Sequence, residues 1–255
     1  METITSAKNP AAKLLRSLKD RAAREETGLF LVEGEKMILE AMNCGLRLHT
    51  LLAENVHLDF AETLSSAGQR YLVPASLMES VCDTKSPQGV CAAFEMPAPL
   101  SISDITGSVV ALDGVQDPGN VGTIWRTADA AGLSAILLGP GSADPLSPKV
   151  QRASMGSGFR VPFLLTDDLP DTLRQLRAQG TCVVASALNG SDFYAAPRPK
   201  GNFALFVGNE ARGISPAARE TADLVVKLPM RGGAESLNAA VAAGILMYAL
   251  TQPCA

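Results

Sequence analysis

Three segments of the sequence place polar side chains directly after apolar runs that have the character of strands. The first contains Asp117-Pro118-Gly119-Asn120 and, inside the helix expected to follow, Arg126. The second is Gly208-Asn209-Glu210, and the third carries Ser236 and Asn238 at the head of an Ala-rich helix. In parallel sheets, ligands bind beyond the carboxyl ends of the strands, so these segments are candidates for one ligand site. Each segment alone also fits an ordinary turn with a surface side chain.

Local roles follow from the residue types in these segments. We expect Asn120 and Ser236 to cap the helices that begin beside them. The missing side chain of Gly208 would let a ligand approach the backbone closely. Asn238 heads an almost wholly apolar stretch, so its amide group should need hydrogen-bond partners.

Several common catalytic and binding motifs are missing from the sequence. The stretch GPGSAD at 139–144 has Asp144 where a dinucleotide-binding fingerprint needs its third glycine, and neither a GK[ST] loop nor a GxSxG elbow occurs. The two histidines, His49 and His57, are far in sequence from the three segments, which argues against a Ser-His-Asp triad. No Cys or His cluster suggests a zinc site, and we expect no metal.

The elements that must position the three segments follow from the alternation of apolar runs and helical patterns. Residues 95–108 are rich in Pro and Ser and predict a linker between a block at 1–100 and a block at 104–255. The first block predicts a small α/β module, with strands at 28–34 and 89–95 and a helix at 35–42. In the second block, helices at 170–179 and 236–250, the latter buried, are among those that alternate with strands. Such alternation predicts an α/β fold whose parallel sheet is covered on both faces. The strands expected in this block are near 108–114, 134–139, 182–188, 203–208 and 224–230.

Composition and cysteine usage are those of an ordinary globular protein. The chain has 255 residues, of which 47% are hydrophobic and 19% are charged. Five scattered cysteines give no disulfide framework and suit a reducing cytoplasm, where we expect the protein to act. The longest apolar run, 237–250, is too short to span a bilayer, so no membrane association is expected.

Charge is distributed unevenly along the chain. The net charge is −4, but residues 1–24 hold six basic residues against Glu2 and Asp20. A second basic stretch, without an acidic residue, lies between Asp144 and Asp167. These stretches are compatible with an electrostatic surface for nucleic acid, although a solvated helix face is the simpler alternative. The residues of these stretches that we expect to contact nucleic acid are Lys8, Lys13, Arg16, Lys149 and Arg152.

The three segments together resemble the SpoU/TrmH family of RNA 2′-O-ribose methyltransferases, within the SPOUT superfamily. The resemblance consists of Asn120 with Arg126 and Thr127-Ala128-Asp129, then Gly208 through Gly213, then Leu228-Pro229-Met230 followed by Glu235-Ser236-Leu237-Asn238. All three motifs occur in the family order over about 130 residues. The stretch FLVEGEKMILEA at 30–41 resembles, more loosely, the substrate-binding domain of the ribosomal-RNA branch.

The resemblance implies a catalytic α/β domain with a deep trefoil knot and an RNA substrate-binding domain ahead of it. It implies S-adenosylmethionine as the cofactor and a homodimer in which the partner subunit completes each site. The cofactor contacts that it implies are Ser186, Ala187, Leu188, Gly208, Leu228, Met230 and Leu237.

The implied reaction is methyl transfer to a ribose 2′-hydroxyl, whose high pKa makes it a weak nucleophile at neutral pH. By resemblance, Arg126 activates the hydroxyl, and its permanent charge favours stabilising the developing alkoxide and positioning a phosphate. Glu210 would orient groups near it, while Asn120, Ser236 and Asn238 would hold the cluster by hydrogen bonds.

We expect the target to be large-subunit ribosomal RNA rather than transfer RNA. Two alternatives to an RNA methyltransferase remain open on the sequence. One is a non-catalytic RNA-binding or ribosome-assembly protein of the same fold. The other is a nucleotide-dependent oxidoreductase or transferase on an ordinary doubly wound sheet, against which the incomplete glycine fingerprint argues.

Overall fold

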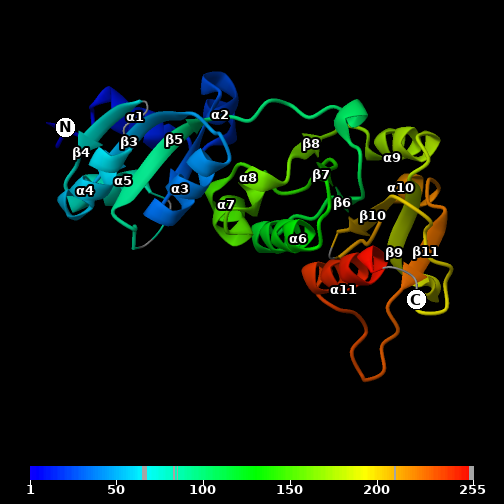
Figure 1. Cartoon of the computed structure of the whole chain (residues 1–255). Coiled ribbons are helices and arrows are strands. Elements are labelled where there is room, and N and C mark those ends of the chain that lie inside the picture. Colours follow the sequence, from blue (N-terminus) through cyan, green and yellow to red (C-terminus); the bar gives the residue numbers. More distant parts are fainter. Residues whose placement is uncertain (65–67, 83, 85, 210, 253–255) are drawn as a thin grey trace. The chain divides into compact units, whose positions relative to one another are not determined.

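The chain divides into two units, which are described separately below (Figure 1). The computed structural model describes residues 1–64, 68–82, 84, 86–209 and 211–252. The first unit comprises Met1–Ala98 together with Leu146–Arg152, and the second comprises Pro99–Pro145 and Ala153–Ala255. The segment Leu146–Arg152 groups with the first unit although it lies beyond residue 100 in the chain. Nothing in its local sequence predicts this grouping.

The second unit is built on a six-stranded sheet with the strand order β11-β9-β10-β6-β7-β8. All its strand pairs are parallel, as the alternating pattern predicts. Its strands are β6 (Val109–Asp113), β7 (Ala135–Leu138), β8 (Phe163–Leu165), β9 (Cys182–Asp192), β10 (Phe203–Gly208) and β11 (Leu224–Lys227). Its helices are η2 (Ile102–Asp104), α6 (Pro118–Ala130), α8 (Ser157–Arg160), α9 (Leu169–Ala178), α10 (Pro216–Arg219) and α11 (Ala239–Thr251), while α7 (Pro148–Ser154) spans the boundary of the two units.

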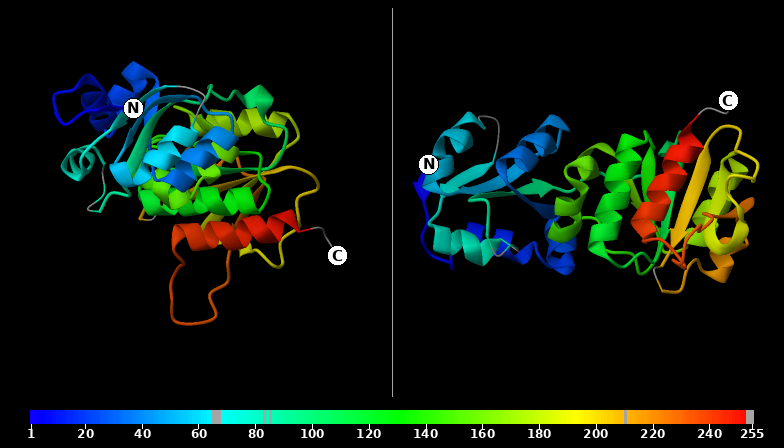
Figure 2. Two further views of the ribbon diagram at one scale, coloured as in Figure 1. Left: turned by 60° about the vertical axis from the view of Figure 1, so that its left-hand side comes forward. Right: turned by 90° about the horizontal axis from the view of Figure 1, so that it is seen from below.

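Helices cover both faces of this sheet. The green α6 and the red α11 lie together on one face, with α11 against β10, and α9 and α10 lie on the other face (Figure 2). Alternate strand residues such as Val109 and Ala111 join Leu173 and Leu176 of α9 in one buried cluster. Because the strands are buried on both faces, they read in the sequence as continuous apolar runs rather than as alternating ones.

The first unit contains a five-stranded mixed sheet with the order β1-β4-β3-β5-β2. β5 is antiparallel to both β2 and β3, whereas β4 is parallel to both β1 and β3. Its strands are β1 (Glu2–Thr3), β2 (Leu29–Glu33), β3 (Leu48–Ala53), β4 (Gln69–Leu72) and β5 (Val90–Glu95). Its helices are α1 (Pro10–Ser17), α2 (Arg21–Thr27), α3 (Glu35–Asn43), η1 (Asn55–His57), α4 (Leu58–Thr63) and α5 (Ala75–Val81).

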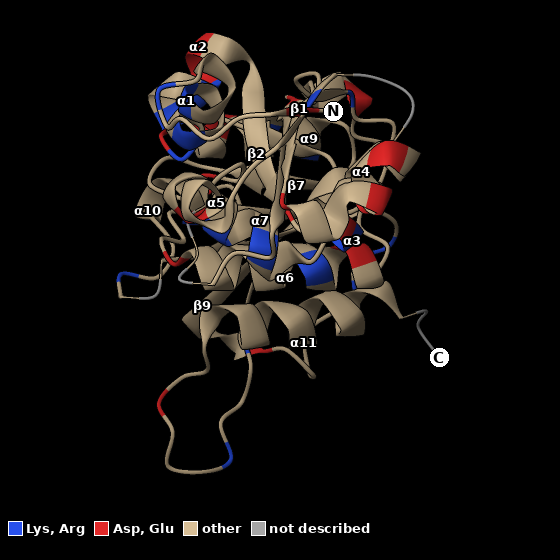
Figure 3. Cartoon of the chain, turned by 90° about the vertical axis from the view of Figure 1, so that its left-hand side faces the viewer, with Lys and Arg blue, Asp and Glu red and all other residues tan. Residues whose placement is uncertain are grey.

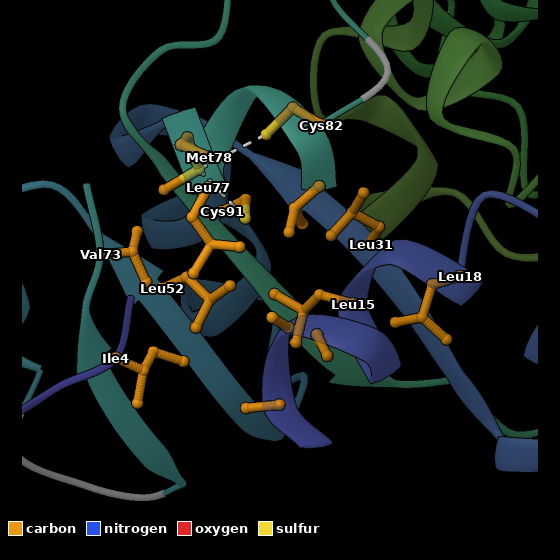
Figure 4. Packing of buried hydrophobic residues seen from close by; sticks show 14 of the residues in the cluster. Ile4, Leu15, Leu18, Leu31, Leu52, Val73, Leu77, Met78, Cys82 and Cys91 are labelled. Atoms are coloured by element: carbon orange, nitrogen blue, oxygen red, sulfur yellow. Dashed lines mark hydrogen bonds between the residues drawn. The ribbon is translucent and has the colours of Figure 1, made fainter. Parts of the chain in front are cut away.

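The core of the first unit lies between this sheet and the helices α1 and α5 (Figure 4). Leu15 and Leu18 pack there with the sulfur-bearing side chains of Met78, Cys82 and Cys91. The thiols of Cys82 and Cys91 both point at the Met78 sulfur, at 3.6 Å. The neighbouring Cys82 thiol, together with burial, raises the pKa of Cys91 well above its usual value. Cys91 therefore stays protonated at neutral pH, and both buried cysteines pack as small apolar side chains.

Two sequence expectations about the second unit need correction. The final helix begins at Ala239 rather than at 236, and it is not buried all round. Val241, Ile245 and Tyr248 are each between 38% and 50% exposed on one side of α11. Strand β9 runs four residues beyond the predicted end at 188, where the register with β11 shifts between Val225 and Val226.

None of the helices formed by the described residues has the length and apolar character needed to cross a membrane.

Candidate functional site

A cavity of about 790 Å³ opens where β9, β10 and β11 reach the carboxyl edge of the sheet. Its walls come from the far half of β9, the end of β10 with the turn after it, the end of α10, the end of β11 with the loop to α11, and the first turn of α11. The residues that line it are Ser186, Ala187, Leu188, Asn189, Val207, Gly208, Asn209, Ala211, Arg212, Gly213, Ile214, Arg219, Lys227, Leu228, Met230, Ser236, Leu237, Asn238, Ala239 and Ala242.

All seven residues that the family resemblance assigns to the cofactor line this cavity, and so do Ser236 and Asn238. The second and third sequence segments, separated in the chain, are therefore walls of one pocket. Asn120 and Arg126 of the first segment are not among the lining residues. Glu210 lies outside the described residues.

The turn after β10 is organised by Asn209, to which the sequence analysis gave no role. The buried Asn209 side chain donates from Nδ2 to the Gly114 carbonyl at 2.8 Å, which ties the end of β10 to the end of β6. Its Oδ1 accepts the backbone N–H groups of Ala211 and Arg212 at 2.9 and 3.0 Å. Backbone hydrogen bonds in both directions between Asn209 and Gly213, each 2.9 Å, close the turn. An Asn directly after a strand-end glycine was the available signal for this role.

Gly208, which lines the cavity, is also required for the fold of the turn that follows it. A β-carbon built on Gly208 would collide with the backbone of Gly213 and Ile214. The glycine therefore allows the turn to fold back against the strand that it follows.

The two helix caps also differ from those expected. Asp117, not Asn120, is the N-cap of α6, and its Oδ1 accepts the backbone N–H of Asn120 at 2.7 Å. Asn238, not Ser236, is the N-cap of α11, where its Oδ1 accepts from Ala240 and Val241. The observed cap lies three residues before the predicted one in α6 and two residues after the predicted one in α11.

Asn238 joins the first and third segments. Its Nδ2 donates to Asn120 Oδ1 at 2.9 Å, so the amino ends of α6 and α11 are bridged by two amide side chains. The partners that Asn238 was expected to need are therefore its own helix and Asn120. A ligand in the cavity would touch a residue whose side chain is already fixed on two sides.

Arg126 is exposed on α6, two turns beyond Asn120. No hydrogen bond or ion pair joins its guanidinium to another described residue. Arg160, by contrast, is held by Asp129, whose Oδ2 accepts from Arg160 Nε and Nη2 at 2.9 and 2.7 Å. Arg126 is thus the cation on this part of α6 that is available to a ligand.

Basic residues in the predicted RNA surface fall into two groups. Lys8 and Lys13 beside and within α1, whose ribbon carries blue segments in Figure 3, are exposed, as is Lys149 of α7. Arg16 instead donates to the Ser80 carbonyl and hydroxyl at 3.1 and 2.7 Å, so it fastens α1 to α5. Arg152 lies in α7 and is half-buried.

Comparison with known proteins decides the family. A sequence model described as the SpoU rRNA Methylase family matches residues 107–248, which is more than half of the chain. This chain belongs to the SpoU rRNA methylase family. The SpoU match contains every residue that lines the cavity, and a second model, the MRM3-like substrate binding domain, matches residues 9–92.

Several known methyltransferases match almost the whole length of the chain. The 23S rRNA (guanosine(2553)-2′-O)-methyltransferase RlmP of Bacillus subtilis is 38% identical over 252 residues, covering 98% of this chain and 99% of its own length. The crystal structure of an AdoMet-bound rRNA methyltransferase from Sinorhizobium meliloti is similar with a TM-score of 0.87 and 35% identity, over 97% and 96% of the two chains. The SpoU methyltransferase AviRb from Streptomyces viridochromogenes, in complex with AdoMet, gives 0.86 and 30%, over 96% and 97%.

Proposed function

We propose that this protein is an S-adenosylmethionine-dependent methyltransferase that methylates a ribose 2′-hydroxyl of large-subunit ribosomal RNA. The observation that carries the proposal is the cavity at the carboxyl edge of the sheet, formed by motif segments of a SpoU-family chain. The full-length similarity to a 23S rRNA 2′-O-methyltransferase supports the choice of ribosomal RNA.

The cavity fits a cofactor of this kind. Its volume of about 790 Å³ lies in the range of roughly 300–1,000 Å³ that is usual for small-molecule sites. Leu188, Leu228 and Leu237 offer apolar surface to a base, and the turn after Gly208 forms a further wall of the cavity. When bound, S-adenosylmethionine supplies a methyl group on a cationic sulfur, which is already a good leaving group.

The chain must then align the ribose hydroxyl and ease the loss of its proton. Arg126 stabilises the developing negative charge on the 2′-oxygen and positions a neighbouring RNA phosphate, which can accept the proton. Asn238 and Asn120, bridged at 2.9 Å, fix the amino ends of the two helices that carry this chemistry. Ser236 lines the cavity beside them, and the role proposed for Glu210 is to orient groups near Arg126.

A homodimer explains why Arg126 does not line the cavity of its own chain. The exposed apolar residues of α11 and Leu237 form a face that a second copy would cover. The segment 231–238 before α11, the long orange loop in Figure 1, is exposed throughout and would be covered with it. In this arrangement the partner's Arg126 faces the cavity of the first chain. The deep trefoil knot remains part of this proposal.

The first unit supplies RNA binding. Lys8 and Lys13, with Lys149 and Arg152, are the proposed phosphate contacts, whereas the bonds of Arg16 to Ser80 favour a structural role for that residue. Because phosphate contacts release counterions, RNA affinity should fall steeply with salt. The proposed location is the cytoplasm.

The test is methyl transfer itself, combined with a map of 2′-O-methylation in total RNA from cells with and without the gene. We expect one ribosomal position to lose its methyl group in the deletion strain and to regain it with the purified protein. Arg126→Ala should abolish transfer and leave S-adenosylmethionine affinity unchanged, because Arg126 is assigned to the ribose and phosphate and is not among the residues assigned to the cofactor, all of which line the cavity. Arg174→Ala, which removes an exposed arginine of α9 on the other face of the sheet, is the matched control. Turnover of Arg126→Ala within a few-fold of wild type would contradict the assignment.

The same experiment separates the alternatives. Loss of a methyl group from a transfer-RNA position in the deletion strain would identify transfer RNA as the substrate. An unchanged map, together with intact RNA binding by the protein, would favour a non-catalytic assembly protein. Thermal stabilisation by NAD but not by S-adenosylmethionine would favour the oxidoreductase.

A further inference from the structure

Met155, which follows α7 in the second unit, has an unusual backbone conformation. Met155 has a φ of 53°, and no other non-glycine residue among those described has a positive φ. Gly156, which follows it, has a φ of 90°. Glycine adopts this left-handed conformation without steric cost, whereas a residue with a β-carbon does so at a cost. The Met155 side chain is also 51% exposed, so burial in the core does not compensate for that cost.

The segment that contains Met155 is fastened along α6. A β-carbon on Gly122 would collide with Ala153 and lies 2.9 Å from the Ser154 nitrogen, so the two backbones touch there. Further along, Ser157 Oγ donates to Asp129 Oδ2 at 2.8 Å. Met155 and Gly156 therefore lie between two fixed points on α6.

Arg126 lies between the same two points on the helix. It follows Gly122 by four residues and precedes Asp129 by three, and residues at these spacings share one face of a helix. The face of α6 that the Met155 segment follows is thus the face that carries Arg126. The exposed Met155 and the exposed cation Arg126 therefore both lie along this face of α6.

We propose that Met155 packs against the base of the nucleotide whose ribose is methylated, and so sets substrate affinity. This inference rests on the proposed function. An unpaired base offers an aromatic face, and a thioether packs favourably on aromatic rings. The left-handed backbone is retained because it directs this side chain to the RNA, while Arg126 beside it acts at the ribose and phosphate.

The competing explanation is that Met155 only ends α7, as a left-handed residue at a helix end commonly does. The two explanations differ for Met155→Gly. Glycine suits the backbone better, so the variant should melt at the same temperature as the wild type or higher under either explanation. Only a role in RNA binding makes this stable variant a poorer enzyme.

The experiment measures initial rates with an unmodified transcript of large-subunit ribosomal RNA and labelled S-adenosylmethionine. For Met155→Gly and Met155→Ala we expect the KM for RNA to rise about tenfold and kcat to change less than about twofold. This pattern is expected because the lost contact would stabilise the bound RNA equally in the ground state and in the transition state. Met155→Leu should recover most of the affinity, and the affinity for S-adenosylmethionine should be unchanged in all three. Leu165→Ala, which trims a side chain of similar exposure at the end of β8, is the matched control.

The outcomes distinguish this inference from the function on which it rests. A KM for Met155→Gly within about twofold of wild type would overturn the inference, and so would a fall in kcat at constant KM, which points to an effect through Arg126. A wild-type protein that methylates no RNA would overturn the proposed function instead.

Discussion

At the scale of single residues, Asn238 has two functions that substitutions can separate. Its Oδ1 caps α11 and its Nδ2 bonds to Asn120. Asn238→Ala removes both interactions and should lower the free energy of unfolding by about 1 kcal/mol, the usual cost of a lost cap. Asn238→Ser keeps an N-cap oxygen but is too short to reach Asn120, so its stability should stay near that of wild type. If the bridge positions the site, both variants lose methyl transfer, as kcat measurements would show. A fully active serine variant would limit Asn238 to capping.

The sequence predicted where the site lies better than it predicted which residues form the hydrogen bonds and turns around it. The second and third sequence segments meet at one cavity because the carboxyl ends of parallel strands share an edge, which follows from the strand order. The capping residues could not be chosen from the sequence, since Asp117 and Asn120 are both good caps and only the backbone conformation distinguishes them. The role of Gly208 likewise depends on Gly213, which returns to contact it.

At the scale of elements, the contact between α6 and the segment after α7 requires glycine on the helix. Gly122→Ala should lower the free energy of unfolding by about 1–3 kcal/mol, because the new methyl group collides with Ala153 and Ser154. Gly244→Ala on α11 is the matched control, since its methyl group would meet only Thr127 Cγ2 at 3.4 Å. That variant should be neutral or up to about 1 kcal/mol more stable, through helix propensity. Urea unfolding of both proteins measures the difference, and equal effects would contradict this account.

The helices and strands that were predicted are those with strong periodicity or clear boundaries. β2 and β5 were expected within one or two residues of their observed ends, as was α9, which has Asp168 as its cap. β1 has two residues and depends on pairing with β4, so no local pattern could reveal it. The extension of β9 depends on the shifted register with β11, where a β-carbon on Gly190 would meet the Val226 backbone.

At the scale of the whole molecule, the basic N-terminal stretch offers fewer cations to a ligand than its sequence suggests. Lys19 donates to the carbonyl groups of Ser80 and Cys82, and the buried Arg24 donates to those of Leu18 and Lys19. These cations, like Arg16, satisfy backbone carbonyl groups inside the first unit. Counting charge along a sequence cannot separate such residues from exposed ones, because the separation depends on what the folded chain places beside them.

The proposed dimer makes a prediction at the same scale. Ile245→Asp places a charge in the exposed apolar face of α11 and should convert a dimer into monomers, as sedimentation would show. Val56→Asp, at an exposed position of the first unit, should leave the assembly unchanged. A wild-type monomer, or an Ile245→Asp dimer, would contradict the use of this face.

A mixture of two inactive variants can test whether each site is shared between chains. Arg126→Ala retains the cavity, while Gly208→Ala should disrupt the turn at 209–213 and disable it. If the partner's Arg126 acts at each cavity, a heterodimer of the two variants has one complete site. Random pairing in an equal mixture would then restore about a quarter of wild-type activity. If Arg126 acts within its own chain, neither chain of the heterodimer has a complete site. The mixture would then stay as inactive as its components.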